Sequence, residues 1–355
     1  PPPPPPPPLF FFKAEAAIRD AQESRGLGDV YKRQRFDRCL RRLLGYINQS
    51  VLEKYLRLGL ILLDNKKIKS SVKVKSDQII FYSDEINFEK KNIKENWDQD
   101  TTKYYTNLYN KILIKETKEY IAINKPSGLA VQGGTSQKYH IDGMLRYLFK
   151  DSNSTKLVHR IDKDTSGLLL VAKDQQTAIT FSNYFKQRKI IKTYLAIVSP
   201  SPKTEMGVID LPIYKAGVKD QKKMIVDHDK GKKAITEYKV LDKVSSRIAL
   251  MALYPKTGRT HQLRVHLEHA NTPIVGDKKY TGSLKVYPSD HRLLEHESIS
   301  QIKWSHDGIK NLQLHAYSIR MPSNDLIEAE VSEDFKKNLK FLGLQLPKNI
   351  DKIFT

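Results

Sequence analysis

The sequence predicts an α+β fold with two parts, a large domain built on a mainly antiparallel, mixed β-sheet with flanking helices and a smaller α/β module before it. From about residue 106 to 345, short β-rich runs follow one another with few helical stretches between them. This order favours antiparallel pairing of neighbours over repeated βαβ crossovers. From 35 to 83, two stretches with apolar residues at helical spacing precede short apolar runs, a pattern typical of a small helix-and-strand module.

In the large domain, alternating and continuous apolar runs bounded by polar or turn residues predict strands, and longer amphipathic stretches predict helices. Between the two parts, residues 84–105 are polar and predict a linker, and 346–355 predict a C-terminal tail. The expected strands are 120–124, 167–172, 193–198, 234–241, 247–253 and 312–320, and the expected helices are 175–188, 260–270 and 335–342.

The small module begins with two expected helices. The first helix carries Leu40, Leu43 and Leu44. Asp37 is expected to cap it, because a short acidic side chain can accept hydrogen bonds from the free backbone N–H groups at the start of a helix. A glycine at position 59 is expected to end the second helix, 50–58. The expected strands of the module are 60–63 and 66–69, which form a hairpin around a turn at 64–65, and 78–82.

The first 34 residues differ from the rest. Residues 1–8 are a proline run, and 24–34 read SRGLGDVYKRQ, which resembles the in-frame translation of a transposase-type sequencing adapter. We interpret 1–34 as such an artefact, expect it to be disordered, and leave it out of reasoning about the fold.

The charge indicates a polyanionic partner. Lys and Arg number 61 against 40 Asp and Glu, a net charge of +21, and residues 35–83 alone carry eleven cations against four anions. An excess of this size is typical of proteins that bind nucleic acid, although a solvated basic face is the alternative. The candidate RNA-contacting residues of the module are Arg35, Arg38, Arg41, Arg42, Arg57, Lys66 and Lys67.

Several classes of function lack their usual signals. The single cysteine, Cys39, excludes a disulfide framework and indicates a reducing, cytoplasmic location. No apolar run approaches the roughly 18 residues that a membrane span needs. Phosphate-cradling glycine motifs and a serine nucleophile elbow are not found. Three histidines between 260 and 270 have no i, i+4 pair and no nearby acid, so we expect no metal.

Three polar stretches, at 124–134, 159–170 and 257–267, stand out. In the second, Asp162 lies on a polar loop that leads directly into an apolar run, a common place for functional groups. In the third, Arg264 lies at the edge of an apolar helical stripe, where a buried guanidinium needs a carboxylate partner. Taken alone, each stretch is compatible with a turn or a solvated face.

Together these motifs resemble the RluA family of RNA pseudouridine synthases, the ribosomal large subunit type. The resemblance rests on HRIDKDTSGLLLVAK at 159–173, IKTYLAIV at 191–198, TGRTHQLRVHL at 257–267, NKPSG at 124–128 and LHAY at 314–317. Residues 35–83 resemble the S4 RNA-binding domain. The resemblance implies a central cleft, an RNA partner and no metal or other cofactor. We also expect a monomer that is not associated with a membrane.

The resemblance also implies residue roles. Asp162 would be the catalytic carboxylate, Arg264 its buried partner, and Tyr194 the ring that stacks on the base and helps to remove the C5 proton. Arg160 would fill the space left by an everted nucleotide. The further residues expected near the substrate are His159, Lys192, Arg259 and Gln262. The implied substrate is large-subunit ribosomal RNA, and AVQGG at 130–134 favours one subgroup of the family.

Alternatives remain open at this point. The chain could bind RNA without catalysis, as a ribosome-assembly factor. A glycoside-type hydrolase would need a second carboxylate at a defined distance from Asp162, for which Asp164 is a weak candidate. The same isomerisation could act on transfer RNA or at another ribosomal position. The sequence does not decide whether Asp162 attacks the sugar, attacks the base or starts glycal formation.

Overall fold

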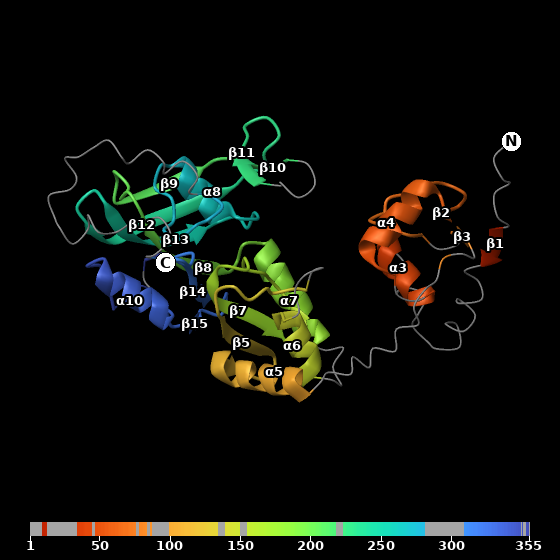
Figure 1. The fold of residues 1–355 in the computed structure, drawn as a ribbon, viewed down its shortest axis with the longest axis horizontal. Coiled ribbons are helices and arrows are strands. Elements are labelled where there is room, and N and C mark those ends of the chain that lie inside the picture. Colours follow the sequence, from red (N-terminus) through yellow and green to blue (C-terminus); the bar gives the residue numbers. More distant parts are fainter. Residues whose placement is uncertain are drawn as a thin grey trace. The chain divides into compact units, whose positions relative to one another are not determined.

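The chain divides into two compact units, Pro1–Trp97 and Asp98–Thr355 (Figure 1). The structure, a computed structural model, describes residues 9–12, 34–44, 47–75, 78–83, 86, 99–133, 139–149, 155–217, 223–280, 309–348, 350 and 353–354. Most of the adapter-like segment, most of 84–98 and all of 281–308 lie outside the described residues.

The N-terminal unit packs two helices against a small sheet. The helices are α3 (Phe36–Leu43) and α4 (Gln49–Leu58), and the antiparallel strands have the order β1 (Leu9–Phe12), β3 (Ile80–Ser83), β2 (Ile61–Leu63). Leu40, Leu52 and Leu56 are fully or almost fully buried in its core. Gly59 ends α4 with a left-handed backbone, φ 82°, as expected for a helix C-terminus.

Two expectations for this unit are wrong. Asp37 does not cap α3: Arg35 occupies the cap position, and the Asp37 carboxylate lies within the first turn and accepts hydrogen bonds from the Arg35 guanidinium. Residues 66–69 are not a strand, and Lys66 forms only an isolated bridge with Leu63. The lysine-rich segment has little apolar surface to bury, so β2 pairs instead with β3, whose Ile80 and Phe81 are buried.

The adapter-like segment also departs from the expected disorder at one place. Leu9–Phe12 form β1, which pairs antiparallel with β3. Four successive apolar residues are compatible with a strand, and this strand satisfies the backbone groups on the second edge of β3.

The C-terminal unit is organised around one large, mixed sheet that is mainly antiparallel, as predicted. Only the pair β7–β14 is parallel among the strand pairs described in it. The order is β4 (Leu113–Glu116), β5 (Tyr120–Lys125), β7 (Ser166–Ala172), β14 (Leu314–Arg320), β8 (Ile191–Val198), β13 (Ile248–Pro255), β12 (Ile235–Val244), β9 (Met206–Asp210), with β15 (Leu326–Glu328) on β14 and β6 (Lys156–Leu157) on β7. A separate hairpin joins β10 (Ile213–Ala216) and β11 (Lys223–Val226).

Side chains of β8 alternate between the two faces of the sheet. Leu195 and Ile197 pack in the cluster that contains α10 (Glu333–Phe341), whereas Ala196 and Val198 pack in the cluster that contains α8 (Gln262–His269). The same alternation directs Tyr194 to the α8 face. Helix α8 therefore covers one face of the sheet at β8, and α10 covers the other face (Figure 1).

The six strands and three helices expected in this unit all occur, with ends that differ by up to three residues. The unit also contains α5 (Gln99–Ile112), α6 (Ile141–Leu148) and α7 (Gln175–Lys186). Residues 99–105 are therefore not linker, because Thr101 and Tyr105 of α5 are buried. Nor are the last residues a free tail, because Leu346, Ile350 and Phe354 pack against the α10 cluster. No described helix is long and apolar enough to cross a membrane.

Two histidines, the fully buried His315 and the partly buried His159, predict how stability depends on pH. His315 binds Ser166 Oγ through Nδ1 and the Ala329 carbonyl through Nε2, and His159 Nε2 accepts the N–H of Leu170. Burial lowers the pKa of His315 to about 4 and that of His159 to about 3. Below the unfolded pKa of about 6.5, the unfolded state binds protons that the folded state excludes. We expect the free energy of unfolding to fall by about 3 kcal/mol for His315 alone between pH 6.5 and pH 4.

Urea unfolding of wild type, His315→Gln and the exposed control His269→Gln at both pH values measures this effect. The pH dependence should be weaker in His315→Gln and unchanged in His269→Gln. Equal pH dependence in all three proteins would contradict a buried neutral His315.

Candidate active site

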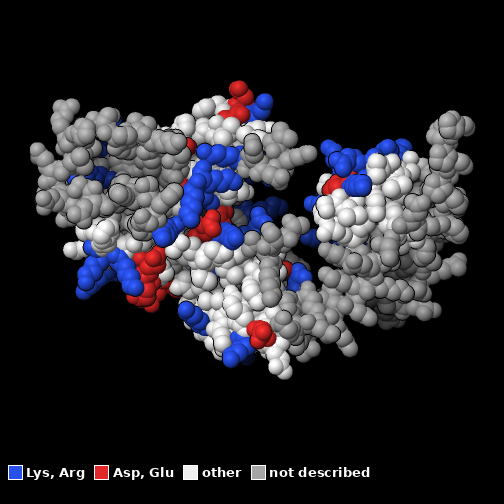
Figure 2. All heavy atoms as spheres, in the orientation of Figure 1, with Lys and Arg blue, Asp and Glu red and all other residues white. Residues whose placement is uncertain are grey.

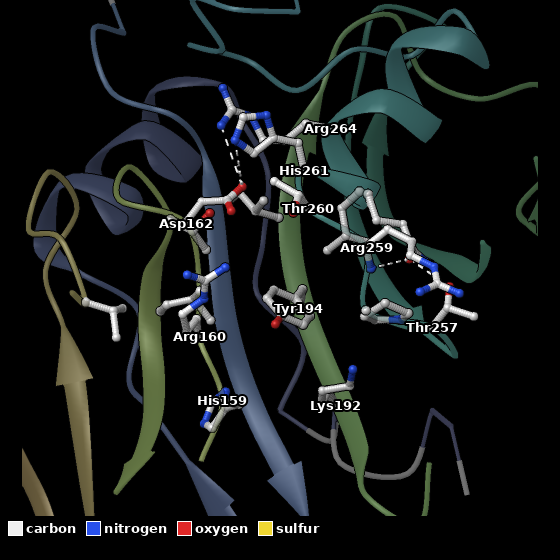
Figure 3. Close-up of a pocket in the computed structure, with 18 of the residues that line it drawn as sticks. His159, Arg160, Asp162, Lys192, Tyr194, Thr257, Arg259, Thr260, His261 and Arg264 are labelled. Atoms are coloured by element: carbon white, nitrogen blue, oxygen red, sulfur yellow. Dashed lines mark hydrogen bonds and ion pairs between the residues drawn. The ribbon is translucent and has the colours of Figure 1, made fainter. Parts of the chain in front are cut away.

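The three polar stretches of the sequence meet in one pocket of about 690 Å³ on the α8 face of the sheet (Figure 3). Asp162 comes from the loop before β7, Tyr194 from β8, and Arg264 from α8. These segments are far apart in the chain, and the mixed sheet brings them together.

Asp162 lies in this pocket beside the Arg264 guanidinium. Its side chain is 27% exposed, and its Oδ2 atom lies 3.6 Å from Arg264 Nη1 and 3.9 Å from His261 Nε2. Arg264 is only 5% exposed. The pairing expected between Asp162 and Arg264 is therefore present, with His261 as a second neighbour of the same carboxylate oxygen.

The 124–128 turn fixes the backbone of the Asp162 loop. The side chain of Lys125 is fully buried, and its Nζ donates to the carbonyls of Pro126, Leu129 and Lys163, each at 2.9 Å. Gly128 N–H also donates to the Lys163 carbonyl, at 3.0 Å. Burial lowers the pKa of Lys125 to about 7, against the opposing effect of the nearby carboxylates Asp164 and Asp162. The turn and the loop thus form one hydrogen-bonded unit.

Arg264 has a second and closer carboxylate partner that the sequence analysis missed. Its Nε and Nη2 donate to Asp277 Oδ2 and Oδ1, both at 2.7 Å, and Asp277 is 1% exposed. Such a two-point contact fixes the plane of the guanidinium. The signal was the need of a buried arginine for a partner, but nothing in the spacing distinguishes Asp277 from other acids.

Tyr194 and Lys192 project from β8 on the pocket side. Burial raises the pKa of the Tyr194 hydroxyl above its usual range, and the negative charge of Asp162 acts in the same direction, so the phenol is neutral near pH 7. Burial lowers the pKa of Lys192 to about 8, helped by the positive charge of Arg188. The pocket thus combines an acidic group, a neutral phenol and an amine.

The other residues expected near the substrate differ in what they do. Arg160 and Arg259 line the pocket and are exposed, with Arg160 Nη1 donating to Gln132 Oε1 and Arg259 Nε to the Lys233 carbonyl. His159 stacks on Phe185 with ring centres 4.6 Å apart and accepts a backbone N–H, so it supports β7.

Gln262 also holds structure together, although we expected it to contact substrate. Its Oε1 accepts from Thr257 Oγ1 and from Arg259 N–H, and its Nε2 donates to the Ile235 carbonyl and to Thr236 Oγ1. All four hydrogen-bonding positions of the amide are engaged, so this side chain joins the start of α8 to β12. Within the described part of the chain, no group of three or more His, Cys, Asp or Glu is placed to hold a metal ion.

The comparisons with known proteins identify the class. A family model described as RNA pseudouridylate synthase matches residues 119–269, a range that contains Asp162, Tyr194 and Arg264. The chain belongs to the RluA-type family of RNA pseudouridine synthases, and it is an enzyme of the isomerase class.

Individual relatives agree with this assignment. The chain is 37% identical over 270 residues to ribosomal large subunit pseudouridine synthase C of Rickettsia conorii, covering 74% of this chain and 86% of the relative. It is 34% identical to the protein of the same name from Buchnera aphidicola, over 75% of this chain and 84% of the relative. Among solved structures, human RNA pseudouridylate synthase domain containing 4 matches with a TM-score of 0.54 and 28% identity, over 69% of this chain and 97% of the human chain.

The Arg264–Asp277 pair predicts the effect of removing one charge. Asp277→Asn keeps the shape of the side chain but leaves a buried guanidinium without its closest carboxylate. Breaking a buried pair in this way costs about 3–5 kcal/mol, and Arg264 would lose its fixed orientation beside Asp162. We expect a large loss of stability in urea unfolding and a lower kcat on RNA. The exposed control Asp325→Asn should change neither quantity, and a wild-type-like Asp277→Asn would show that this pair does not order the site.

Proposed function

We propose that this enzyme converts specific uridines of 23S ribosomal RNA to pseudouridine, with Asp162 as the catalytic carboxylate. The observation that carries the proposal is a partly buried carboxylate in a pocket of about 690 Å³, with a buried guanidinium 3.6 Å away and a partly buried tyrosine on β8. A carboxylate facing a polyanionic partner would weaken binding, so its place here is explained better by chemistry than by affinity.

The reaction requires few groups. The N1–C1′ bond of uridine breaks, the base turns, and C5 bonds to C1′, after which the C5 proton is lost and N1 gains one. An ionised carboxylate beside the ribose or base provides a nucleophile or a base for the first step. The nucleotide must leave the RNA helix to reach the carboxylate, and the rim residues Arg160 and Arg259 are suited to contacts with the flanking phosphates.

The remaining roles follow from position and charge. Arg264 orients Asp162 through an ion pair at 3.6 Å. Tyr194 stacks on the everted base, and its neutral hydroxyl assists transfer of the C5 proton. Lys192 lies near the start of β8 and lines the same pocket, where it contacts the substrate backbone.

The large-subunit target is supported by the relatives named synthase C and by AVQGG at 130–134, which resembles synthase C more than synthase D. The basic surface supports an RNA partner of some size. Figure 2 shows Lys and Arg side chains gathered across the middle of the C-terminal unit. The other outcomes of a substrate test are a synthase D-type position or transfer RNA.

We also propose that the 35–83 module is an S4-type RNA-binding domain. Arg38, Arg57, Lys66 and Lys67 are exposed and suited to phosphate contacts. Arg35 and Arg41 are engaged within the module, Arg35 with Asp37 and Arg41 with the Ile47 carbonyl and Gln49. The side chain of Arg42 lies outside the described residues.

Asp162→Asn tests the catalytic role. The amide keeps the volume of the side chain but is neither a nucleophile nor a base, so we expect RNA binding to persist and pseudouridine formation to cease. A transcript of 23S ribosomal RNA incubated with each protein and mapped for pseudouridine measures the effect. Turnover by Asp162→Asn would remove Asp162 from the mechanism.

The module is tested by the salt dependence of RNA binding. Replacing Arg57, Lys66 and Lys67 by Ala removes up to three phosphate contacts, each of which contributes roughly 0.7–0.9 to the slope of log K against log salt. We expect a shallower slope with little change in kcat. Lys337→Ala with Lys340→Ala on α10, on the sheet face away from the pocket, is the control. Equal slopes in the two variants would contradict an RNA-binding module.

A further inference from the structure

His261 is an unassigned group at the reacting carboxylate. It occupies the position before α8 with a left-handed backbone, φ 53°, a conformation uncommon for residues other than glycine. Its imidazole is turned into the pocket (Figure 3), where Nε2 lies 3.9 Å from Asp162 Oδ2. The hydrogen bond of its other ring nitrogen, Nδ1, decides which tautomer of the imidazole faces Asp162.

Tyr280 determines that form. The Tyr280 side chain is 1% exposed, and its hydroxyl lies 2.7 Å from His261 Nδ1 and accepts the N–H of Met224 at 3.2 Å. A buried hydroxyl places its one proton on an acceptor. Of its two hydrogen-bonding neighbours among the described residues, the Met224 N–H is a donor, so Nδ1 must be the acceptor. The proton of the neutral ring is therefore on Nε2, the nitrogen that faces Asp162.

Burial of the ring favours this neutral form. Burial lowers the pKa of His261, and the positive charges of Arg264 and Lys279 lower it further, against the carboxylates of Asp162 and Asp277. Burial also raises the pKa of Tyr280 to about 12, which keeps its hydroxyl protonated. At neutral pH the ring is thus an uncharged N–H donor beside the carboxylate.

Both neighbours of Asp162 approach the same oxygen. Arg264 Nη1 and His261 Nε2 lie on Oδ2 at 3.6 Å and 3.9 Å, which leaves Oδ1 as the oxygen presented to substrate. The distances exceed a hydrogen bond, but catalytic contacts often shorten when substrate closes the site. A neutral donor orients the carboxylate without supplying a second positive charge.

We propose that His261 is a positioning residue, held by Tyr280 as its Nε2–H tautomer, which with Arg264 fixes one oxygen of Asp162 so that the other faces the target uridine. The proposal rests on the catalytic role proposed for Asp162. Tyr280 acts one step further away, through the ring nitrogen.

The tautomer is measured directly by nitrogen NMR of protein labelled with 15N-histidine, with the His261 signals assigned by their loss in His261→Gln. The wild type should show an unprotonated Nδ1 and a protonated Nε2 near pH 7.5. Tyr280→Phe, which keeps the ring against Arg264, should give a mixture of tautomers. A protonated Nδ1 in the wild type would overturn the proposal without any reference to activity.

Kinetics test the effect on Asp162. His261→Leu should lower kcat by about tenfold or more, as for loss of one hydrogen bond to a charged group, with KM for RNA little changed. His261→Gln places an amide N–H close to the position of Nε2 and should restore much of the rate. His269→Leu, at the exposed end of the same helix, is the control. Equal kcat in His261→Leu and wild type would refute the positioning role while Asp162→Asn remained inactive, whereas an active Asp162→Asn would refute the proposed function itself.

Discussion

The geometry of the site depends on a buried ion pair to which Asp162 does not belong. Arg264 is fixed by two short hydrogen bonds to Asp277, with both side chains almost fully buried. Its third nitrogen, Nη1, is left to face Asp162 at 3.6 Å. A guanidinium held only by Asp162 would be free to move with it, whereas one anchored by Asp277 offers Asp162 a fixed positive charge. The strength of such a pair comes from geometry and complete hydrogen bonding.

The backbone of Asp162 is fixed in a similar way from the opposite side. Lys125 binds the carbonyls of Pro126 and Leu129, in and just after the 124–128 turn, and that of Lys163 in the Asp162 loop. The loop then enters β7. Gly167 in β7 has φ 108°, and a Cβ there would lie 2.2 Å from the Ala316 carbonyl oxygen. This close approach occurs where β7 and β14 pair in parallel. The loop is thus held at both ends by contacts that tolerate little change.

Much of this arrangement is predictable from the sequence, because periodicity reports burial directly. The alternating runs located the central strands, and the polar stretches located Asp162 and Arg264. Tyr194 lies in an apolar run and was assigned only through the resemblance of IKTYLAIV at 191–198 to the family. Helix α5 was missed because its polar composition hides the few buried positions, such as Tyr105. The pairing of β2 with β3 was missed because register depends on burial of the partner strand, Ile80 and Phe81. Asp277, Tyr280 and His261 could not be assigned, since their roles depend on contacts between segments.

The account as a whole is tested most directly by mapping pseudouridine in the RNA of source cells with and without this gene, and after complementation with wild type or Asp162→Asn. The account predicts that specific pseudouridines of 23S ribosomal RNA disappear without the gene, return with the wild type, and stay absent with Asp162→Asn. An unchanged 23S map, or sites restored by Asp162→Asn, would contradict it.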